Sequence, residues 1–402
     1  MADLSFSNVM AVLAIAVIAP LVAAAIPKVK VPGIVIEFGL GVIVGPDVLG
    51  WVKIDEPLDV LSLLALGFLL FIAGTEVEVS SLRGPLLIKA VGGYFIGLAL
   101  ALVIATALGA ADVVMTPSLI AVILSATGLG VVLPILRGAN LTTTRAGQSI
   151  LIVATVAEFS AVLLLALFFG EDGTGVLSNL LIVVLYAVVA FVLWVLLKWV
   201  ERRPRLTKQF EQMEGGTVQL RIRLALLILL VFLVLSQRFG LESILGAFAA
   251  GIVLGDLRRH DRDDPASSFW PKVEALGFGF LIPLYFVTSG VRFKLSDLLD
   301  STSALLRVPL FLVLFLVVRG VPALLFRRKL GGRTTVALAL LSATSLSFVI
   351  TATDIGVRIG KLRDINATAL VGAAVVAMVI FPLIAQSLLA PRTDDEAAAQ
   401  RG

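Results

Sequence analysis

The eight residues Ser125-Ala-Thr-Gly-Leu-Gly-Val-Val132 return as Ser342-Ala-Thr-Ser-Leu-Ser-Phe-Val349, 217 positions later (342 − 125), each inside a long apolar segment. Two further pairs match in the same order and at nearly the same offset: Gly41-Val-Ile-Val-Gly45 with Gly251-Ile-Val-Leu-Gly255, and Gly74-Thr-Glu-Val-Glu-Val-Ser80 with Gly290-Val-Arg-Phe-Lys-Leu-Ser296. Three ordered matches indicate that the chain consists of two homologous halves.

The composition identifies an integral membrane protein, because 59% of the residues are hydrophobic, 15% are charged and the mean hydropathy is +1.06. A helix needs about 20 apolar residues to cross the hydrocarbon layer, and about thirteen such spans can be read from the sequence. We predict an all-α polytopic membrane protein with spans at 8–26, 32–50, 59–78, 84–109, 117–136, 146–169, 175–197, 222–239, 241–257, 273–291, 303–326, 333–356 and 366–390.

The basic residues predict the orientation in the cell membrane. With the N-terminus outside and the C-terminus in the cytoplasm, about 21 of the 32 Lys and Arg residues fall in inner loops and about 7 in outer loops. The same asymmetry explains the net charge of +4 without a nucleic acid partner. The chain has no cysteine and a single histidine, His260, so we expect no disulfide, no resident metal and no cofactor.

The spacing of the repeat predicts inverted topology. The two Ser-Ala-Thr segments lie in the fifth and twelfth spans, and an odd separation reverses orientation across the membrane, as in many secondary transporters. We therefore expect a first repeat at 1–170, a connector helix and cytoplasmic linker at 171–218, a second repeat at 219–391 and a cytoplasmic tail at 392–402. No P-loop or nucleophile elbow is present, which disfavours ATP-driven pumping and hydrolysis.

Small and hydroxylated residues in the middle of a span have two interpretations. They can pack helices closely, or they can mark a broken helix whose freed carbonyls and hydroxyls bind a cation at the membrane midplane. Because the segment occurs in inverted copies, we favour two broken helices, which would carry Ser125, Thr127, Ser342 and Thr344.

Glu158 lies about twelve residues into the sixth span, with apolar residues on both sides. A charge at that depth costs about 2.5–3.5 kcal/mol on insertion scales, so the carboxyl requires a partner or a function. One carboxylate holds either a proton or a monovalent cation, and this competition is the chemical basis of antiport. A structural salt bridge is the alternative. Thr155, one helical turn earlier, is a candidate hydroxyl ligand.

Three further charged residues belong to the prediction. Arg319, in the eleventh span, is a candidate counter-ion for Glu158 or Glu76, and its guanidinium cannot carry the exchanged proton. Glu76 lies near the inner end of the third span, where an interfacial role is the alternative to ion binding. Glu37 is expected to be an end or cap residue of the second span.

Together these motifs resemble the monovalent cation:proton antiporters of the sodium/hydrogen exchanger superfamily. The resemblance covers nearly the whole chain and rests on five stretches: Pro32-Gly-Ile-Val-Ile-Glu37 to Gly45-Pro-Asp-Val-Leu-Gly50, Leu69-Leu-Phe-Ile-Ala-Gly-Thr-Glu76, Leu124-Ser-Ala-Thr-Gly-Leu-Gly-Val-Val-Leu-Pro134, Thr144-Arg-Ala-Gly-Gln148 and Ile282-Pro-Leu-Tyr-Phe-Val-Thr-Ser-Gly-Val-Arg-Phe-Lys-Leu295.

The resemblance implies an elevator mechanism and a homodimer in the lipid membrane. It also implies a mobile core, built from spans four to six and eleven to thirteen, in which the two broken helices cross. By position, Glu158 matches the family's ion-binding Asp, Thr127 a crossing-helix hydroxyl, and Arg319 a charge-balancing Lys or Arg. The chain departs from the family in having Ala157-Glu158 where a polar residue usually precedes the acid. With a single carboxylate, we expect electroneutral exchange of H⁺ for Na⁺ or K⁺.

Two alternatives remain open at this point. One is a proton-coupled carrier of another small substrate, which the small Ala157 would accommodate. The other is a non-transporting sensor or subunit that kept the fold, and the retained charges of Glu158 and Arg319 argue against it.

Overall fold

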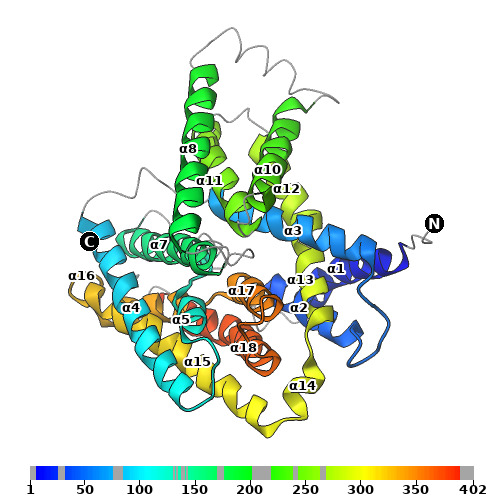
Figure 1. Ribbon diagram of the computed structural model, residues 1–402, viewed down its shortest axis with the longest axis vertical. Coiled ribbons are helices and arrows are strands. Elements are labelled where there is room, and N and C mark those ends of the chain that lie inside the picture. The colour runs from blue at the N-terminus through cyan, green and yellow to red at the C-terminus, as the bar shows by residue number, and fades with distance from the viewer. Residues whose placement is uncertain are drawn as a thin grey trace, which may run out of the picture. The chain divides into compact units, whose positions relative to one another are not determined.

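The computed structural model describes residues 6–25, 32–75, 85–129, 132, 135–136, 141, 144–169, 176–201, 219–238, 243–262 and 269–389. Every regular element in these ranges is a helix (Figure 1). Eight helical stretches among them are long and apolar enough to cross a membrane. The predicted all-α, multi-pass membrane architecture is thereby confirmed.

The chain divides into two compact units, and the first comprises residues 1–81 and 162–295. Its helices are α1 (Ser7–Ala25), α2 (Gly33–Val44), α3 (Glu56–Thr75), α8 (Val176–Glu201), α10 (Leu220–Arg238), α11 (Ser243–Arg262), α12 (Phe269–Leu276), the π-helical turn η1 (Gly277–Leu281) and α13 (Ile282–Arg292).

The second unit comprises residues 82–161 and 296–402. Its helices are α4 (Pro85–Ala110), α5 (Pro117–Ser125), α7 (Arg145–Phe168, whose last turns belong to the first unit), α14 (Leu295–Leu299), α15 (Thr302–Ala323), the 3₁₀ turn η2 (Leu324–Phe326), α16 (Arg327–Ser342), α17 (Leu346–Arg358) and α18 (Asp364–Leu389).

Each unit contains residues of both predicted repeats. The second unit combines spans four to six with spans eleven to thirteen, the set that the family resemblance assigns to the core. The predicted boundaries at 170, 218 and 391 follow the sequence repeat and remain predictions. Glu76, residues 171–175 and 202–218 of the connector and linker, and the tail at 392–402 lie outside the described residues.

Glycines that match between the repeats are the points where helices of the first unit cross. A Cβ atom on Gly41 of α2 would lie 2.1 Å from the Val287 carbonyl oxygen of α13, and one on Gly290 would lie 2.1 Å from the Phe38 oxygen. No side chain fits at that distance, so α2 and α13 pack backbone to backbone.

The second crossing joins the equivalent helices. A Cβ atom on Gly251 of α11 would lie 2.1 Å from the Phe71 carbonyl oxygen of α3, and one on Gly74 would lie 2.2 Å from the Phe248 oxygen. Gly41 matches Gly251 and Gly74 matches Gly290 in sequence. Each repeat therefore contributes one helix to each crossing, which explains why these short motifs recur.

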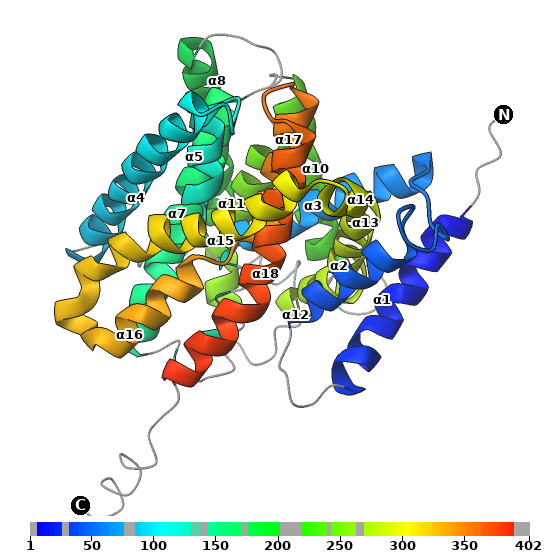
Figure 2. The same cartoon turned by 90° about the horizontal axis from the view of Figure 1, so that it is seen from below.

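In the second unit, α15, α16 and α18 lie side by side (Figure 2). Helix α5 packs on α4 and ends at Ser125, and α16 ends at Ser342, so both Ser-Ala-Thr segments begin where a helix stops.

The structure departs from the expected spans in three places. The second span is shorter than 32–50, because α2 ends at Val44, where extended Gly45 is followed by Pro46, a residue that disfavours helix before it. The tenth span is interrupted by η1. The twelfth starts earlier, at Arg327, and contains a kink at Gly331, whose φ is 76°.

Candidate functional site

The first broken helix, α5, ends at Ser125. Ser125 Oγ donates to the Val122 carbonyl at 3.0 Å, and Ala126 adopts an extended conformation (φ −80°, ψ 144°). Residues 126–128 are not helical, and helical geometry is found again at Leu129. The Ser125 hydroxyl thus provides a partner for a carbonyl in the last turn of α5, where helical partners are missing.

In the second break the other hydroxyl of the repeated motif, Thr344, bonds back to its own helix, whereas Ser342, the counterpart of Ser125, has no partner in the described part of the chain. Thr344 Oγ1 donates to the Leu341 carbonyl at 2.7 Å, and residues 343–345 separate α16 from α17. A backbone hydrogen bond of 2.7 Å runs from Gly128 N to the Thr344 carbonyl, and Thr127 Oγ1 donates to the Ser342 carbonyl at 2.8 Å. The two breaks therefore pair with each other, which agrees with the predicted crossing of broken helices.

Arg319 lies on the carbonyl ends of both half-helices. Its side chain is 6% exposed. Its Nε donates to the Leu124 carbonyl, and its Nη1 donates to the Ser342 carbonyl at 3.0 Å. Nη1 also donates to Thr127 Oγ1 at 2.6 Å, and Nη2 to the Ile123 carbonyl at 3.4 Å. A buried cation at helix C-termini offsets the partial negative charge of carbonyls that have no helical partner.

Glu158 lies at the amide end of the first break. It is 3% exposed, and its Oε2 accepts a hydrogen bond of 2.8 Å from the backbone N of Leu129, the first helical residue after the break. A carboxylate is favoured at such a helix N-terminus, where amide groups lack helical partners. Arg319 and Glu158 thus occupy electrostatically opposite helix ends in one unit.

The remaining predicted site residues of the second unit are all buried. Ser125, Thr127, Thr155, Ser342 and Thr344 are at most 6% exposed. Thr155 lies one turn before Glu158 on α7, so its assignment as a ligand remains a prediction. The hydroxyls of Ser342 and Ser345 are buried without a hydrogen-bond partner in the part of the chain that the structure describes.

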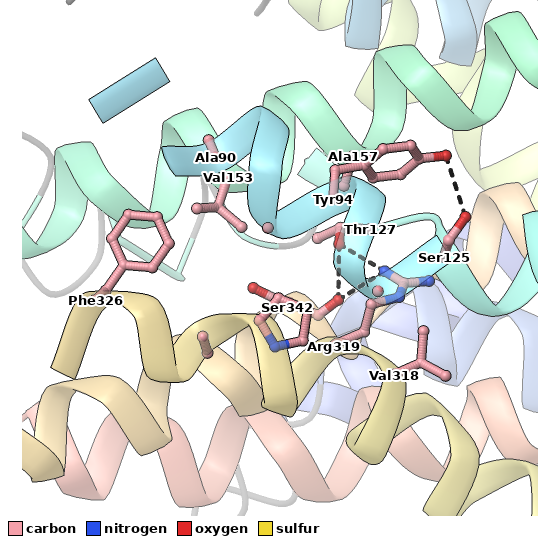
Figure 3. A pocket seen from close by; sticks show the side chains of 14 residues that line it. Ala90, Tyr94, Ser125, Thr127, Val153, Ala157, Val318, Arg319, Phe326 and Ser342 are labelled. Carbon is pink, nitrogen blue, oxygen red and sulfur yellow. Dashed lines mark hydrogen bonds between the residues drawn. The ribbon is translucent and has the colours of Figure 1, made fainter. Parts of the chain in front are cut away.

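A small cavity adjoins the crossing (Figure 3). The cavity has a volume of ≈ 30 Å³, which is room for about two water molecules. The cavity is lined by Arg319, Thr127 and Ser342, which belong to the helix crossing, and by Ala157, the residue that precedes Glu158.

Sequence reasoning missed two residues at this site. Tyr94 of α4 lines the cavity, and its hydroxyl lies 3.1 Å from Ser125 Oγ (Figure 3). Ser345 occupies the position that Gly128 holds in the first copy (128 + 217). The Gly-to-Ser difference between the copies was available as a signal for Ser345, whereas nothing around Tyr94 in the sequence connects it with the break.

Buried opposite charges at two crossing, broken helices of inverted repeats define a secondary membrane transporter rather than an enzyme. A family model described as "Sodium/hydrogen exchanger, transmembrane" matches residues 13–391. The chain therefore belongs to the sodium/hydrogen exchanger family, as the sequence motifs predicted.

Individual relatives agree with this membership. The chain is 29% identical to the "Putative Na(+)/H(+) antiporter YjbQ" of Bacillus subtilis over 96% of its own length and 64% of that protein. It is 26% identical to the "Probable Na(+)/H(+) antiporter 3" of Methanocaldococcus jannaschii, covering 92% of this chain and 94% of that one.

A solved structure shares the fold. The sodium proton antiporter MjNhaP1 from Methanocaldococcus jannaschii matches with a TM-score of 0.62 at 17% identity, covering 96% of this chain and 99% of that chain. The likeness supports the inverted-repeat architecture.

Proposed function

We propose that this protein is a secondary antiporter that exchanges protons for a monovalent cation, Na⁺ or K⁺, across the cell membrane. The observation that carries the proposal is the buried Glu158 carboxylate, bonded to Leu129 N beside a helix break. The two relatives named as Na⁺/H⁺ antiporters favour Na⁺ as the first ion to test, and the similarity to the "Na(+)/H(+)-K(+) antiporter GerN" of Bacillus cereus makes K⁺ the second.

In this mechanism Glu158 holds either ion but not both. Burial favours the protonated, neutral carboxyl, and a bound cation favours the ionised one, so cation entry expels the proton. We assign Thr127 and Thr155 as hydroxyl ligands, and Glu76 as a further candidate. Arg319 stays charged and balances the carbonyl ends of the half-helices when the site is empty.

The stoichiometry follows from the number of carboxylates. Ala157 precedes Glu158, so this pair supplies one titratable group. One carboxylate exchanges one proton for one monovalent cation, and the cycle moves no net charge.

A proton-coupled carrier of another substrate is the weaker proposal. The relatives that the chain resembles are named as Na⁺/H⁺ antiporters. The cavity beside the crossing does not bear on this choice, because Glu158 and Thr155 are absent from its lining.

The finer features of the mechanism rest on the family and on charge distribution. We propose an elevator in which the second unit is the mobile core, a homodimer in the lipid membrane, and an N-terminus outside with the C-terminus in the cytoplasm. Cysteine scanning of this cysteine-free chain with impermeant thiol reagents tests the orientation, beginning with Ser7 and Arg328 at opposite predicted faces.

The direct test is exchange by purified protein in liposomes that contain a pH-sensitive dye. Na⁺, K⁺ and Li⁺ are added in turn to the wild type and to Glu158→Gln. We expect cation-driven proton movement in the wild type and at least a 100-fold lower rate in the variant, because an amide cannot exchange a proton near neutral pH.

The matched control is Glu56→Gln, which neutralises an exposed acid at the start of α3. It should exchange at the wild-type rate. Unchanged exchange in Glu158→Gln, or no response of the wild type to any of the three cations, contradicts the proposal.

A further inference from the structure

Glu37 of α2 is a buried acid that the proposed exchange does not use. It is 9% exposed, and its Oε2 has no hydrogen-bond partner among the residues that the structure describes. The sequence predicted an end or cap residue. The structure instead places Glu37 in the second turn of α2, one turn before Gly41, where α2 crosses α13.

The helices packed on α2 are α1 and α13, and they bring few charges to this crossing. Helix α1 contains no titratable side chain between Ser7 and Ala25. Helix α13 contains Tyr285 and Arg292, and Arg292 donates to Asp59 of α3.

Arg292, the one basic side chain of α13, has its partner elsewhere. It lies two residues after Gly290, whose Cβ position is against the Phe38 carbonyl oxygen, and its guanidinium donates to Asp59. No described residue of α1 or α13 is bonded to Glu37 Oε2.

The other half of the molecule shows that the crossing does not require a carboxyl. The offset of 210 between Gly41 and Gly251 aligns Glu37 with Ala247 (37 + 210), which is 0% exposed on α11. Helix α11 crosses α3 through the same glycine geometry. Since an alanine packs at the matching position, the crossing does not need a carboxyl group at Glu37. Apolar surroundings also disfavour the ionised state of the Glu37 side chain.

We propose that Glu37 is a proton-binding site of the first unit, separate from the exchange carboxylate Glu158. With its proton bound, the neutral side chain packs beside the α2–α13 crossing. When the proton leaves, an unpaired carboxylate draws water to the crossing and weakens the contact between the two helices. The site thereby couples the stability of the first unit to pH, whether or not Glu158 exchanges ions.

Labelling with dicyclohexylcarbodiimide tests the proton directly, because this apolar reagent adds to protonated carboxyl groups inside membranes. Wild type, Glu37→Gln and Glu158→Gln are treated between pH 5.5 and 9, with and without Na⁺, and the adduct on the Glu37 peptide is quantified by mass spectrometry. We expect an adduct on Glu37 that declines with rising pH, by roughly tenfold per unit above its midpoint.

Sodium distinguishes the two acids. The Glu37 adduct should be unchanged by Na⁺ and by Glu158→Gln, whereas Na⁺ should protect Glu158 if the exchange proposal holds. Absence of a Glu37 adduct at every pH, as an ion pair with a basic side chain would give, overturns the inference. Protection of Glu37 by Na⁺ overturns it as well, because the residue would then be part of a cation site.

Thermal unfolding provides the second readout. The Tm of the wild type should fall as pH rises from 6 to 9. The Tm of Glu37→Gln and of Glu37→Ala should fall less over the same range. The alanine variant copies Ala247 of the other repeat. The exposed-acid control Glu56→Gln should follow the wild type. Parallel curves for the wild type and both Glu37 variants would contradict the coupling between protonation and the crossing.

Discussion

The helices of the first unit cross as intact helices, whereas those of the second unit cross at breaks. In the first unit the helices cross at Gly41 with Gly290 and at Gly74 with Gly251, where no side chain fits. In the second unit the crossing helices are broken, and hydroxyls, carbonyls and amides meet at Thr127.

The two kinds of crossing differ in the backbone groups that are free to bind an ion. An intact helix uses its own backbone groups, so the glycine crossings have no free carbonyl or amide to bind an ion. A broken helix exposes those groups, and Arg319 and Glu158 occupy the carbonyl and amide ends. We therefore expect substitutions at the breaks of the second unit to change ion exchange as well as stability, and substitutions at the glycines of the first unit to change stability.

Arg319 should give the largest effect on folding. Arg319→Met removes hydrogen bonds to three carbonyls and to Thr127, which leaves buried acceptors unpaired and should lower the free energy of unfolding by about 3–5 kcal/mol. Arg319→Lys keeps the charge but reaches fewer acceptors, so we expect an intermediate loss. Thermal unfolding in detergent measures both, and a wild-type Tm for Arg319→Met would show that the guanidinium does not support the crossing.

Substitution of the matched glycines should lower the free energy of unfolding by the same amount in both repeats. Gly41→Ala and Gly251→Ala each place a methyl group 2.1 Å from a backbone oxygen, and helix separation should cost about 2–3 kcal/mol. Gly39→Ala on α2 is the matched control, since its Cβ would have no neighbour within 4 Å. Unequal losses at the two matched glycines would weaken the equivalence of the crossings.

Thr127 should affect exchange more than stability. Thr127→Val removes the bond to the Ser342 carbonyl and the acceptor for Arg319 Nη1, at a cost of about 1–2 kcal/mol. We expect a KM for the cation that is about 5–20 times higher, since 1.4 kcal/mol corresponds to tenfold. Thr127→Ser keeps the hydroxyl and should restore the wild-type KM in the liposome assay. An unchanged KM in Thr127→Val would remove this hydroxyl from the site.

Ser345 should give the smallest effect. Ser345→Gly copies Gly128 of the first repeat, and its hydroxyl has no partner in the described part of the chain. Because no hydrogen bond is lost, we expect the free energy of unfolding to change by no more than about 0.5 kcal/mol. Thermal unfolding and KM should be compared in the same variant, and a large loss of stability would indicate that the two breaks differ in construction.

Much of the fold could be predicted from the sequence because lipid imposes a strict rule on the backbone. A chain inside hydrocarbon must satisfy its own hydrogen bonds, so long apolar segments become helices. Span 146–169 therefore corresponds to α7, and span 366–390 to α18. The end of α2 at Val44 was mispredicted, because an apolar segment can leave the helix where Gly45-Pro46 changes the backbone.

The candidate site was predictable only in part. Glu158 and Arg319 are conspicuous because charges are rare in apolar spans, and the repeat indicated the breaks. The partners of Arg319 were not predictable. The sequence offered Glu158 and Glu76 as counter-ions, and the structure shows the guanidinium donating to carbonyls of α5 and α16. The place of Tyr94 at the site and the burial of Glu37 could likewise not be predicted from the sequence.

The sequence by itself determined the helical membrane class, the inverted repeat and the family, because these depend on residue type and periodicity along one chain. Only the tertiary structure decided which helix ends face which charges. The pairing of Gly128 with Thr344, of Glu158 with Leu129 and of Arg319 with two half-helices joins residues 23 to 216 positions apart. Such pairings depend on the direction in which each broken helix presents its backbone, and that direction is set by packing rather than by local sequence.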